Sequence, residues 1–206
     1  WLEAWTAILN IMNSKRMEYL DEFDEIFRGT QSLFNWVQDL EMELENAGRE
    51  EKKFFKDRIL FCEAFIDRFP DEDSLVIENM KRAIGESYFE IGEPEKTESL
   101  YKKWLKDDPK WGWGWIAWSD CYWFYKKGNK DYEKAEKILK EGIAAVGVRD
   151  KREILDRLES LYSETGRKKN AEVSRQKIDI LDKMEGTVEI SKKGNILRLK
   201  KTLDFG

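Results

Sequence analysis

Carboxylates, two cysteines and nine tryptophans are the residue types in this 206-residue sequence that could take part in chemistry. Histidine is absent, which removes the most common general base and the most common metal ligand. Cys62 and Cys121 lie in no CxxC motif, so free thiols in a reducing cytoplasm are their expected state. Acidic pairs such as Asp71 and Asp73 precede expected helices, where carboxylates act as caps. We therefore expect no enzyme activity, no metal and no cofactor.

The densest group of candidate binding residues is the aromatic stretch 108–125, DPKWGWGWIAWSDCYWFY. If residues 111–125 form one helix, the 3.6-residue period sorts their side chains onto two stripes. The first stripe is Trp111, Trp115, Trp118, Tyr122 and Tyr125, and the second is Trp113, Ile116, Asp120 and Trp123. Both faces are then apolar, so each has to be covered or used for binding. Gly112 and Gly114 weaken such a helix, which suggests that another group packs closely against it.

The composition indicates an all-helical protein. Charged residues make up 38% and hydrophobic residues 41%, with only three prolines, which suits packed helices better than a sandwich or barrel. The net charge of −5 argues against nucleic-acid binding, although residues 1–50 carry −7 and residues 166–201 carry +6. No long apolar run and no signal peptide is visible, so we expect no membrane span and a cytoplasmic location.

Helical periodicity and turn residues indicate the organisation of the chain. Helices are expected at residues 1–12, 14–28, 31–46, 51–69, 73–91, 95–106, 111–126, 132–146, 149–164 and 168–184. Residues 1–29 are expected to form N-terminal capping helices. Residues 30–185 form the main domain, with hairpins at about 30–70, 73–109, 110–147 and 149–184. The segment 186–206 is a separate tail, for which a small β-hairpin and a disordered basic tail both remain open.

The expected hairpins recur with a period typical of a repeat protein. The glycines expected to close them, Gly48, Gly92, Gly128 and Gly166, fall 44, 36 and 38 residues apart. A helix–turn–helix unit with a period near these values is typical of an α-solenoid.

The unit resembles the tetratricopeptide repeat (TPR) family at specific residues. The unit that starts at Glu78 matches at Gly85, Tyr88, Gly92, Tyr101 and Pro109, while Thr97 and Trp104 stand where alanine is usual. The following units match at Trp115, Trp118, Ser119, Tyr122, Ala135 and Leu139, and then at Leu158, Tyr162, Gly166 and Ala171. The resemblance covers about residues 31–180. It implies an all-α superhelix of antiparallel hairpins but no particular partner, because these repeats serve many functions.

Two segments, GTQSLFNWVQDLEMELENAG and WGWGWIAWSDCYWFY, also resemble the helical part of uncharacterised bacterial proteins that often end in a cysteine-rich SEC-C zinc motif. No CPCG-type run occurs in this sequence. This resemblance therefore implies neither a zinc site nor an inherited function.

In TPR geometry the first aromatic stripe is core and the second faces the concave groove. The partner-binding residues that the resemblance implies are Asn79, Arg82, Glu86, Phe89, Trp113, Ile116, Asp120 and Trp123. A groove that also contains Met42 suits an apolar peptide, since tryptophan and arginine dominate binding hot spots. We therefore expect a non-catalytic interaction module that binds a peptide or protein partner.

Three alternatives remain open at this point. Residues 1–28 would fill the groove if they folded into it. A small-ligand or carbohydrate pocket would use Trp113 and Trp123 as aromatic platforms, with Glu86 and Asp120 as its candidate catalytic acids. The aromatic face would also serve homodimerisation.

Overall fold

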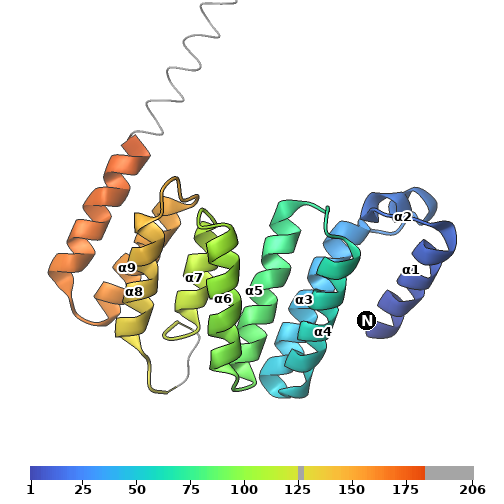
Figure 1. The fold of residues 1–206 in the computed structure, drawn as a ribbon, viewed down its shortest axis with the longest axis horizontal. Coiled ribbons are helices and arrows are strands. Elements are labelled where there is room, and N and C mark those ends of the chain that lie inside the picture. The colour runs from blue at the N-terminus through green and yellow to red at the C-terminus, as the bar shows by residue number, and fades with distance from the viewer. Residues whose placement is uncertain (125–127, 184–206) are drawn as a thin grey trace, which may run out of the picture. The chain divides into compact units, whose positions relative to one another are not determined.

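The computed structural model of the chain describes residues 1–124 and 128–183, and all regular secondary structure within these ranges is helical (Figure 1). The expected all-α class is therefore confirmed for the described residues. The chain divides into two compact units, Trp1–Asp107 and Asp108–Gly206, and each is described by itself. The segment 186–206, expected as a β-hairpin or a disordered tail, lies outside the described residues.

Unit 1 is a series of packed helices. They are α1 (Leu2–Lys15), α2 (Leu20–Ile26), α3 (Leu33–Glu50), α4 (Lys53–Arg68), α5 (Ser74–Glu90) and α6 (Pro94–Asp107). From α3 to α6 each helix packs on the next, and α3 also contacts α5 (Figure 1). Ser32 and Asp73 cap α3 and α5, because their side chains accept backbone N–H bonds from Asn35 and Leu75. Helices α3 and α5 therefore lie side by side, and α4 packs against both.

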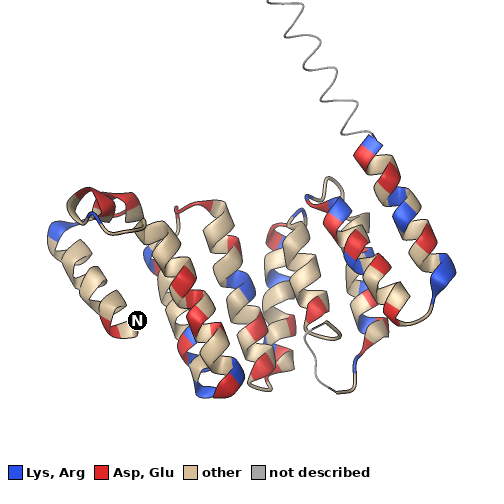
Figure 2. Cartoon of the chain, turned by 180° about the vertical axis from the view of Figure 1, so that it is seen from behind, with Lys and Arg blue, Asp and Glu red and all other residues tan. Residues whose placement is uncertain are grey.

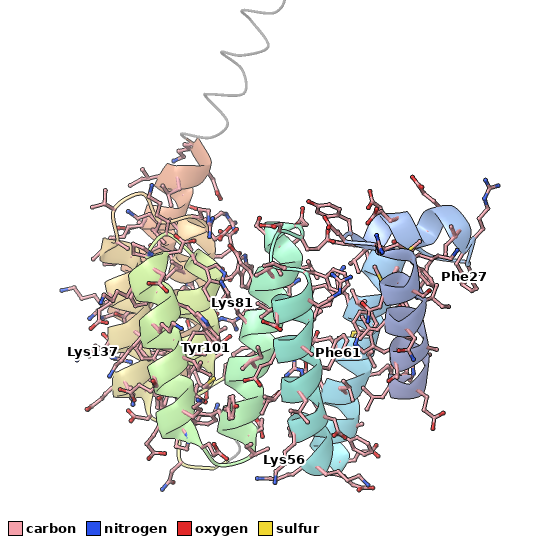
Figure 3. The ribbon with its side chains drawn as sticks, turned by 45° about the vertical axis from the view of Figure 1, so that its right-hand side comes forward. Phe27, Lys56, Phe61, Lys81, Tyr101 and Lys137 are labelled. Carbon is pink, nitrogen blue, oxygen red and sulfur yellow. The ribbon has the colours of Figure 1, made fainter. Side chains whose placement is uncertain are left out.

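Helix α1 joins the core of unit 1 through Trp5. Its ring packs edge-on against Phe61 of α4, which Figure 3 labels. The ring centroids of Trp5 and Phe61 are 5.5 Å apart, and the Trp5 ring lies 6.3 Å from both Phe65 and Phe69. Trp36 of α3 stacks on it at 6.4 Å. Each such pair contributes about 0.5–1.5 kcal/mol beyond its buried area. The N-terminal helix thus extends the hydrophobic core that α3 and α4 build.

The hairpin of α5 and α6 closes around Gly85. A Cβ at this position would lie 2.5 Å from Cε2 of Tyr101, so only glycine lets the tyrosine ring pack there. Thr97 donates its hydroxyl to the Gly85 carbonyl at 2.9 Å. The turn that follows α5 is at Gly92, whose φ of 91° favours glycine.

Gly48 does not end its helix, so the sequence-based prediction for this residue is wrong. Helix α3 continues through Gly48 to Glu50. A Cβ on Gly48 would lie 2.7 Å from the ring of Phe55 in α4. The glycine is thus needed for close helix packing, which a sequence pattern does not distinguish from a helix stop.

Unit 2 is described at residues 108–124 and 128–183. Its helices are α7 (Gly112–Asp120), α8 (Tyr132–Ala144), α9 (Lys151–Glu164) and a further helix over residues 168–183. Helix α8 packs on α7 and on α9, and α7 also contacts α9. The turn glycines Gly128, Gly147 and Gly166 all have positive φ, as tight turns require.

Helix α7 is shorter than the expected helix 111–126. After Asp120 the chain continues in turns, in which the Tyr122 N–H bonds to the Ser119 carbonyl and the Trp123 N–H to the Asp120 carbonyl. These three-residue spacings are tighter than an α-helix and commonly end one. The Tyr122 carbonyl instead accepts the N–H of Asp131, which begins the hairpin to α8.

The glycines of α7 are sites of close approach, as expected. A Cβ on Gly112 would lie 2.1 Å from the carbonyl oxygen of Arg149, and one on Gly114 would lie 2.3 Å from the Trp111 ring. The Arg149 N–H donates to the Lys110 carbonyl at 2.8 Å, so the two backbone segments are joined here.

None of the helices in the described ranges has a stretch that is long and apolar enough to cross a bilayer.

Candidate binding face

The predicted site residues fall into two groups, one in each unit. Asn79, Arg82, Glu86 and Phe89 all lie on α5 of unit 1, where their side chains are half-buried. Trp113, Ile116, Asp120 and Trp123 belong to unit 2. Of these, Trp113 is half-buried and the other three are buried.

The buried tryptophan of the second stripe serves packing within unit 2. Trp123 is 1% exposed, and its indole N–H donates to the Ser119 hydroxyl at 3.2 Å. Its ring contacts Phe124 edge-on at 5.4 Å and Tyr132 at 6.3 Å. The ring is thus covered in this structure. The use of Trp123 as a platform for a sugar or a peptide stays a prediction.

Asp120 is likewise an internal residue. Its carboxylate pairs with Arg157 of α9, with 3.3 Å between Oδ2 and Nη2. The Arg157 guanidinium also lies 4.0 Å from the ring centroid of Phe124. Ile116 is 2% exposed. The second stripe does not extend along one helix, because α7 ends at Asp120 and Trp123 lies in the turns that follow. A helical period also does not show which side chains become covered.

The most developed polar cluster in unit 1 surrounds Arg58 of α4. This guanidinium is 3% exposed and donates through Nε to Glu41 at 2.6 Å and through Nη2 to Glu45 at 3.0 Å. It also reaches the Glu86 carboxylate at 3.4 Å and the Ser87 hydroxyl at 3.3 Å. One arginine thus joins carboxylates from α3 and α5. Charge-assisted contacts of this kind are the strong class of hydrogen bond.

The charges in this cluster shift one another's pKa. Burial opposes the charge of Arg58, but the carboxylates of Glu41, Glu86 and Glu45 outweigh burial and raise its pKa. Burial raises the pKa of Glu86, and the nearby arginines only partly offset this. Burial also raises the pKa of the Cys62 thiol, so this cysteine stays protonated and is a poor nucleophile.

We define the α3–α5 face as Glu41, Met42 and Glu45 of α3 together with Asn79, Arg82 and Glu86 of α5. Arg82 donates to the Asn79 side-chain oxygen at 3.4 Å and lies 4.0 Å from the Glu86 carboxylate. The side chains of Glu41, Glu45 and Glu86 are 16%, 28% and 15% exposed, and Met42 is 50% exposed. Figure 2 shows the acidic residues recurring along α3. The face is therefore acidic and polar, with one apolar side chain in reach of solvent.

Sequence reasoning brought Asn79, Arg82 and Glu86 together correctly but missed Arg58, Glu41 and Glu45. A signal was present, because Arg58 falls within the apolar stripe of its helix, where a charge needs partners. The spacing of Glu41 and Glu45 also puts both on one helical face. Which helices supply the partners is decided only when α3, α4 and α5 pack.

Arg58 supplies one positive charge to the three carboxylates that it joins, and the nearby Cys62 thiol stays protonated. Among the described residues, no group of three His, Cys, Asp or Glu side chains is arranged to hold a metal ion.

No model of a known protein family matches the chain, and its sequence matches no curated protein.

Proposed function

We propose that this chain is a TPR-like helical-repeat module that binds a segment of a partner protein and carries out no catalysis. The TPR assignment is supported by Gly85 and Tyr101, which occupy the small and large positions of the motif and pack against each other. Thr97 stands at a position where the motif has alanine, and its hydroxyl bonds to the Gly85 carbonyl. Gly92 and Gly166 occupy the turn position with positive φ.

The observation that carries the binding proposal is the Arg58 cluster on the α3–α5 face. Arg58 is buried and holds Glu41, Glu45 and Glu86 in place, so little side-chain entropy is lost when a partner binds them. Each carboxylate keeps some exposed surface and can accept further hydrogen bonds. Met42 adds an exposed, adaptable apolar contact.

Charge indicates what kind of partner segment fits this face. Unit 1 contains 25 acidic and 15 basic residues, a net charge of −10. Such a field attracts basic segments and speeds their association. The proposed partner is therefore a peptide with lysine or arginine side chains beside an apolar one. A role for Trp113, Ile116, Asp120 and Trp123 in binding stays a prediction, as do homodimerisation, the filling of the groove by residues 1–28 and the relation to SEC-C-associated proteins.

A cytoplasmic location is part of the same proposal. Both cysteines, Cys62 and Cys121, are buried free thiols. Free thiols are the usual state of cysteine in a reducing compartment.

A peptide-display selection on the full chain tests the binding proposal. We expect enriched peptides to combine basic and apolar residues, and their affinity to fall as the salt concentration is raised. Met42→Lys should weaken these peptides strongly, because it puts a positive charge on the face that receives them.

Leu60→Lys is the matched control, since Leu60 is 65% exposed on α4 and the same charge is added there. Circular dichroism checks that both variants remain folded. Selection of acidic peptides, or equal loss of binding in the two variants, would refute the proposed face.

A further inference from the structure

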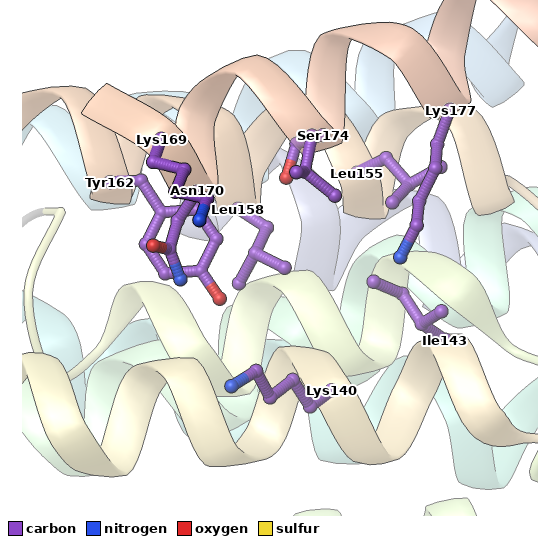
Figure 4. Close-up of a pocket in the computed structure, with 10 residues that line it drawn as sticks. Lys140, Ile143, Leu155, Leu158, Tyr162, Lys169, Asn170, Ser174 and Lys177 are labelled. Carbon is purple, nitrogen blue, oxygen red and sulfur yellow. The ribbon is translucent and has the colours of Figure 1, made fainter. Parts of the chain in front are cut away.

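A second feature of the molecule is a cavity inside unit 2, between α8, α9 and the helix over residues 168–183 (Figure 4). Its volume is about 470 Å³, which falls in the range of small-molecule sites. Leu155 and Leu158 of α9 form its buried apolar wall, and Ile143 and Val173 add apolar surface from the helices on either side. The cavity therefore offers apolar surface against which an apolar group can pack.

Three lysines border this apolar wall. Lys140 comes from α8, and Lys169 and Lys177 come from the helix over residues 168–183. In Figure 4 the ammonium group of Lys177 points toward Ile143, and the side chain of Lys140 runs along α8. The cavity thus combines apolar walls with a basic rim.

Only part of this positive charge is matched by acids of the protein. Glu136 accepts bonds from Lys140 at 2.5 Å and from the Tyr162 hydroxyl at 3.0 Å, and it also pairs with Arg167. Lys169 and Lys177, in contrast, form no ion pair with any residue in the described ranges. Among the described residues, two ammonium groups beside this apolar wall therefore have no acidic partner.

We propose that this cavity binds an amphiphilic organic anion, in which an apolar chain ends in a carboxylate or phosphate group. The chain packs against Leu155, Leu158 and Val173, and the anionic head pairs with the ammonium group of Lys169 or of Lys177, which lie on either side of Val173 along the helix. Lysine ammonium groups bind both kinds of head group as point charges. Ser174 is buried in the cavity wall and supplies a hydroxyl close to the apolar surface.

Residues 184–206 contain five basic and three acidic residues, so their charge has the same sign as the rim of the cavity. The charge complementarity instead favours a negatively charged ligand. This proposal concerns unit 2 and does not depend on peptide binding by the α3–α5 face.

Calorimetric titration of the full chain tests the proposal with four probes. Dodecanoate and dodecyl phosphate, each below its micelle concentration, should bind saturably. Dodecanol, which lacks the charge, and inorganic phosphate, which lacks the chain, should bind at least about tenfold more weakly. Whichever of the two anions binds more tightly identifies the preferred head group.

Two double variants show whether binding takes place at this cavity. Lys169→Ala with Lys177→Ala should weaken the tighter anion about tenfold or more. Lys137→Ala with Lys168→Ala removes the same charge from lysines that do not line the cavity, and it should bind as the wild type does. Hydrogen exchange on the wild-type complex should show new protection in α8, α9 and residues 168–183.

Three results would each overturn the proposal. They are the absence of saturable binding by both anions, equal affinity of the two double variants, and binding of inorganic phosphate as tightly as dodecyl phosphate. Binding of dodecanol with the affinity of dodecanoate would refute the assigned role of the lysines. Circular dichroism at the highest probe concentration distinguishes binding from unfolding by the amphiphile.

Discussion

Replacing Arg58 with methionine removes the guanidinium that Glu41, Glu45 and Glu86 share inside unit 1. The substitution keeps an unbranched side chain of similar length in the core and deletes only the charge and its donors. In the wild type Arg58 makes hydrogen bonds of 2.6 Å to Glu41 and 3.0 Å to Glu45, and its side chain is 4% exposed. The variant therefore leaves three carboxylates close together with their buried counter-ion missing.

The expected cost follows from these contacts. A hydrogen bond to a charged group contributes about 1.5–3 kcal/mol, so the two short bonds together contribute about 3–6 kcal/mol. Removing one partner of a buried ion pair costs about 3–5 kcal/mol, which agrees with the value from the two hydrogen bonds. Methionine recovers part of this by burying its side chain. We expect Arg58→Met to lower the free energy of unfolding of unit 1 by about 3–4 kcal/mol at pH 7.

The loss of stability caused by Arg58→Met should be smaller at pH 5 than at pH 7. Burial already raises the pKa of Glu86 in the wild type, and loss of Arg58 raises it further because an attractive positive charge is gone. A carboxyl whose pKa is higher in the folded than in the unfolded state binds protons on folding, so its stability contribution falls as pH rises through that window. The variant should thus recover part of its deficit between pH 7 and pH 5.

Urea unfolding of the full chain followed by circular dichroism, at pH 7 and at pH 5, measures both quantities. Because the chain has two units, hydrogen exchange in α3–α5 assigns the loss to unit 1. Arg49→Met is the matched control, since Arg49 pairs with Glu45 but its side chain is 60% exposed, and it should cost at most about 1 kcal/mol. A deficit below about 1 kcal/mol for Arg58→Met, or one that is equal at the two pH values, would contradict this account of the cluster.

Two further substitutions test unit 2. Trp123→Ala should lower its free energy of unfolding by about 3–5 kcal/mol in urea titrations, because a fully buried ring and its bond to Ser119 are lost; an unchanged midpoint would mean that the ring is not core. Desolvation opposes ionisation of Glu136, but bonds from Lys140, Arg167 and the nearby tyrosine outweigh it and lower its pKa to about 2. The pKa of Glu136 is thus lower in the folded than in the unfolded state. The carboxylate therefore contributes fully to the free energy of unfolding above about pH 4.5, and this contribution disappears as the pH falls toward 2. Glu136→Gln should lower the free energy of unfolding by about 1–2 kcal/mol at pH 7, a range that allows for solvent screening. The thermal midpoints of the variant and the wild type should converge near pH 2. Midpoints that stay equally far apart at pH 7 and near pH 2 would contradict this.

Helix type and position were predictable because they depend on local spacing. The 3.6-residue period and the caps predicted α1 to α9 and the helix over residues 168–183, with differences mainly at the ends. Close approach at Gly112 and Gly114 was also predictable, since glycine inside a helix is costly unless another group needs the space. Gly48 shows the limit of this reasoning, because a glycine required for packing and one required for a turn look the same in sequence.

The candidate sites were less predictable because they depend on contacts between helices. Asn79, Arg82 and Glu86 share one face of α5 by spacing alone, and the structure keeps them together. Arg58 lies on a different helix, and nothing local indicates that its charge meets Glu41 and Glu45.

The sequence by itself determined that the described chain is helical and where most of its helices lie. Only the tertiary structure decided which stripes are covered. Trp123 and Asp120 became interior residues because α8 and α9 pack over α7, whereas Arg58, from the apolar stripe of α4, became the centre of a charged cluster. The physical reason is that periodicity is a property of a single helix. Burial and the pairing of charges depend on the neighbouring helices, whose order and spacing no local pattern records.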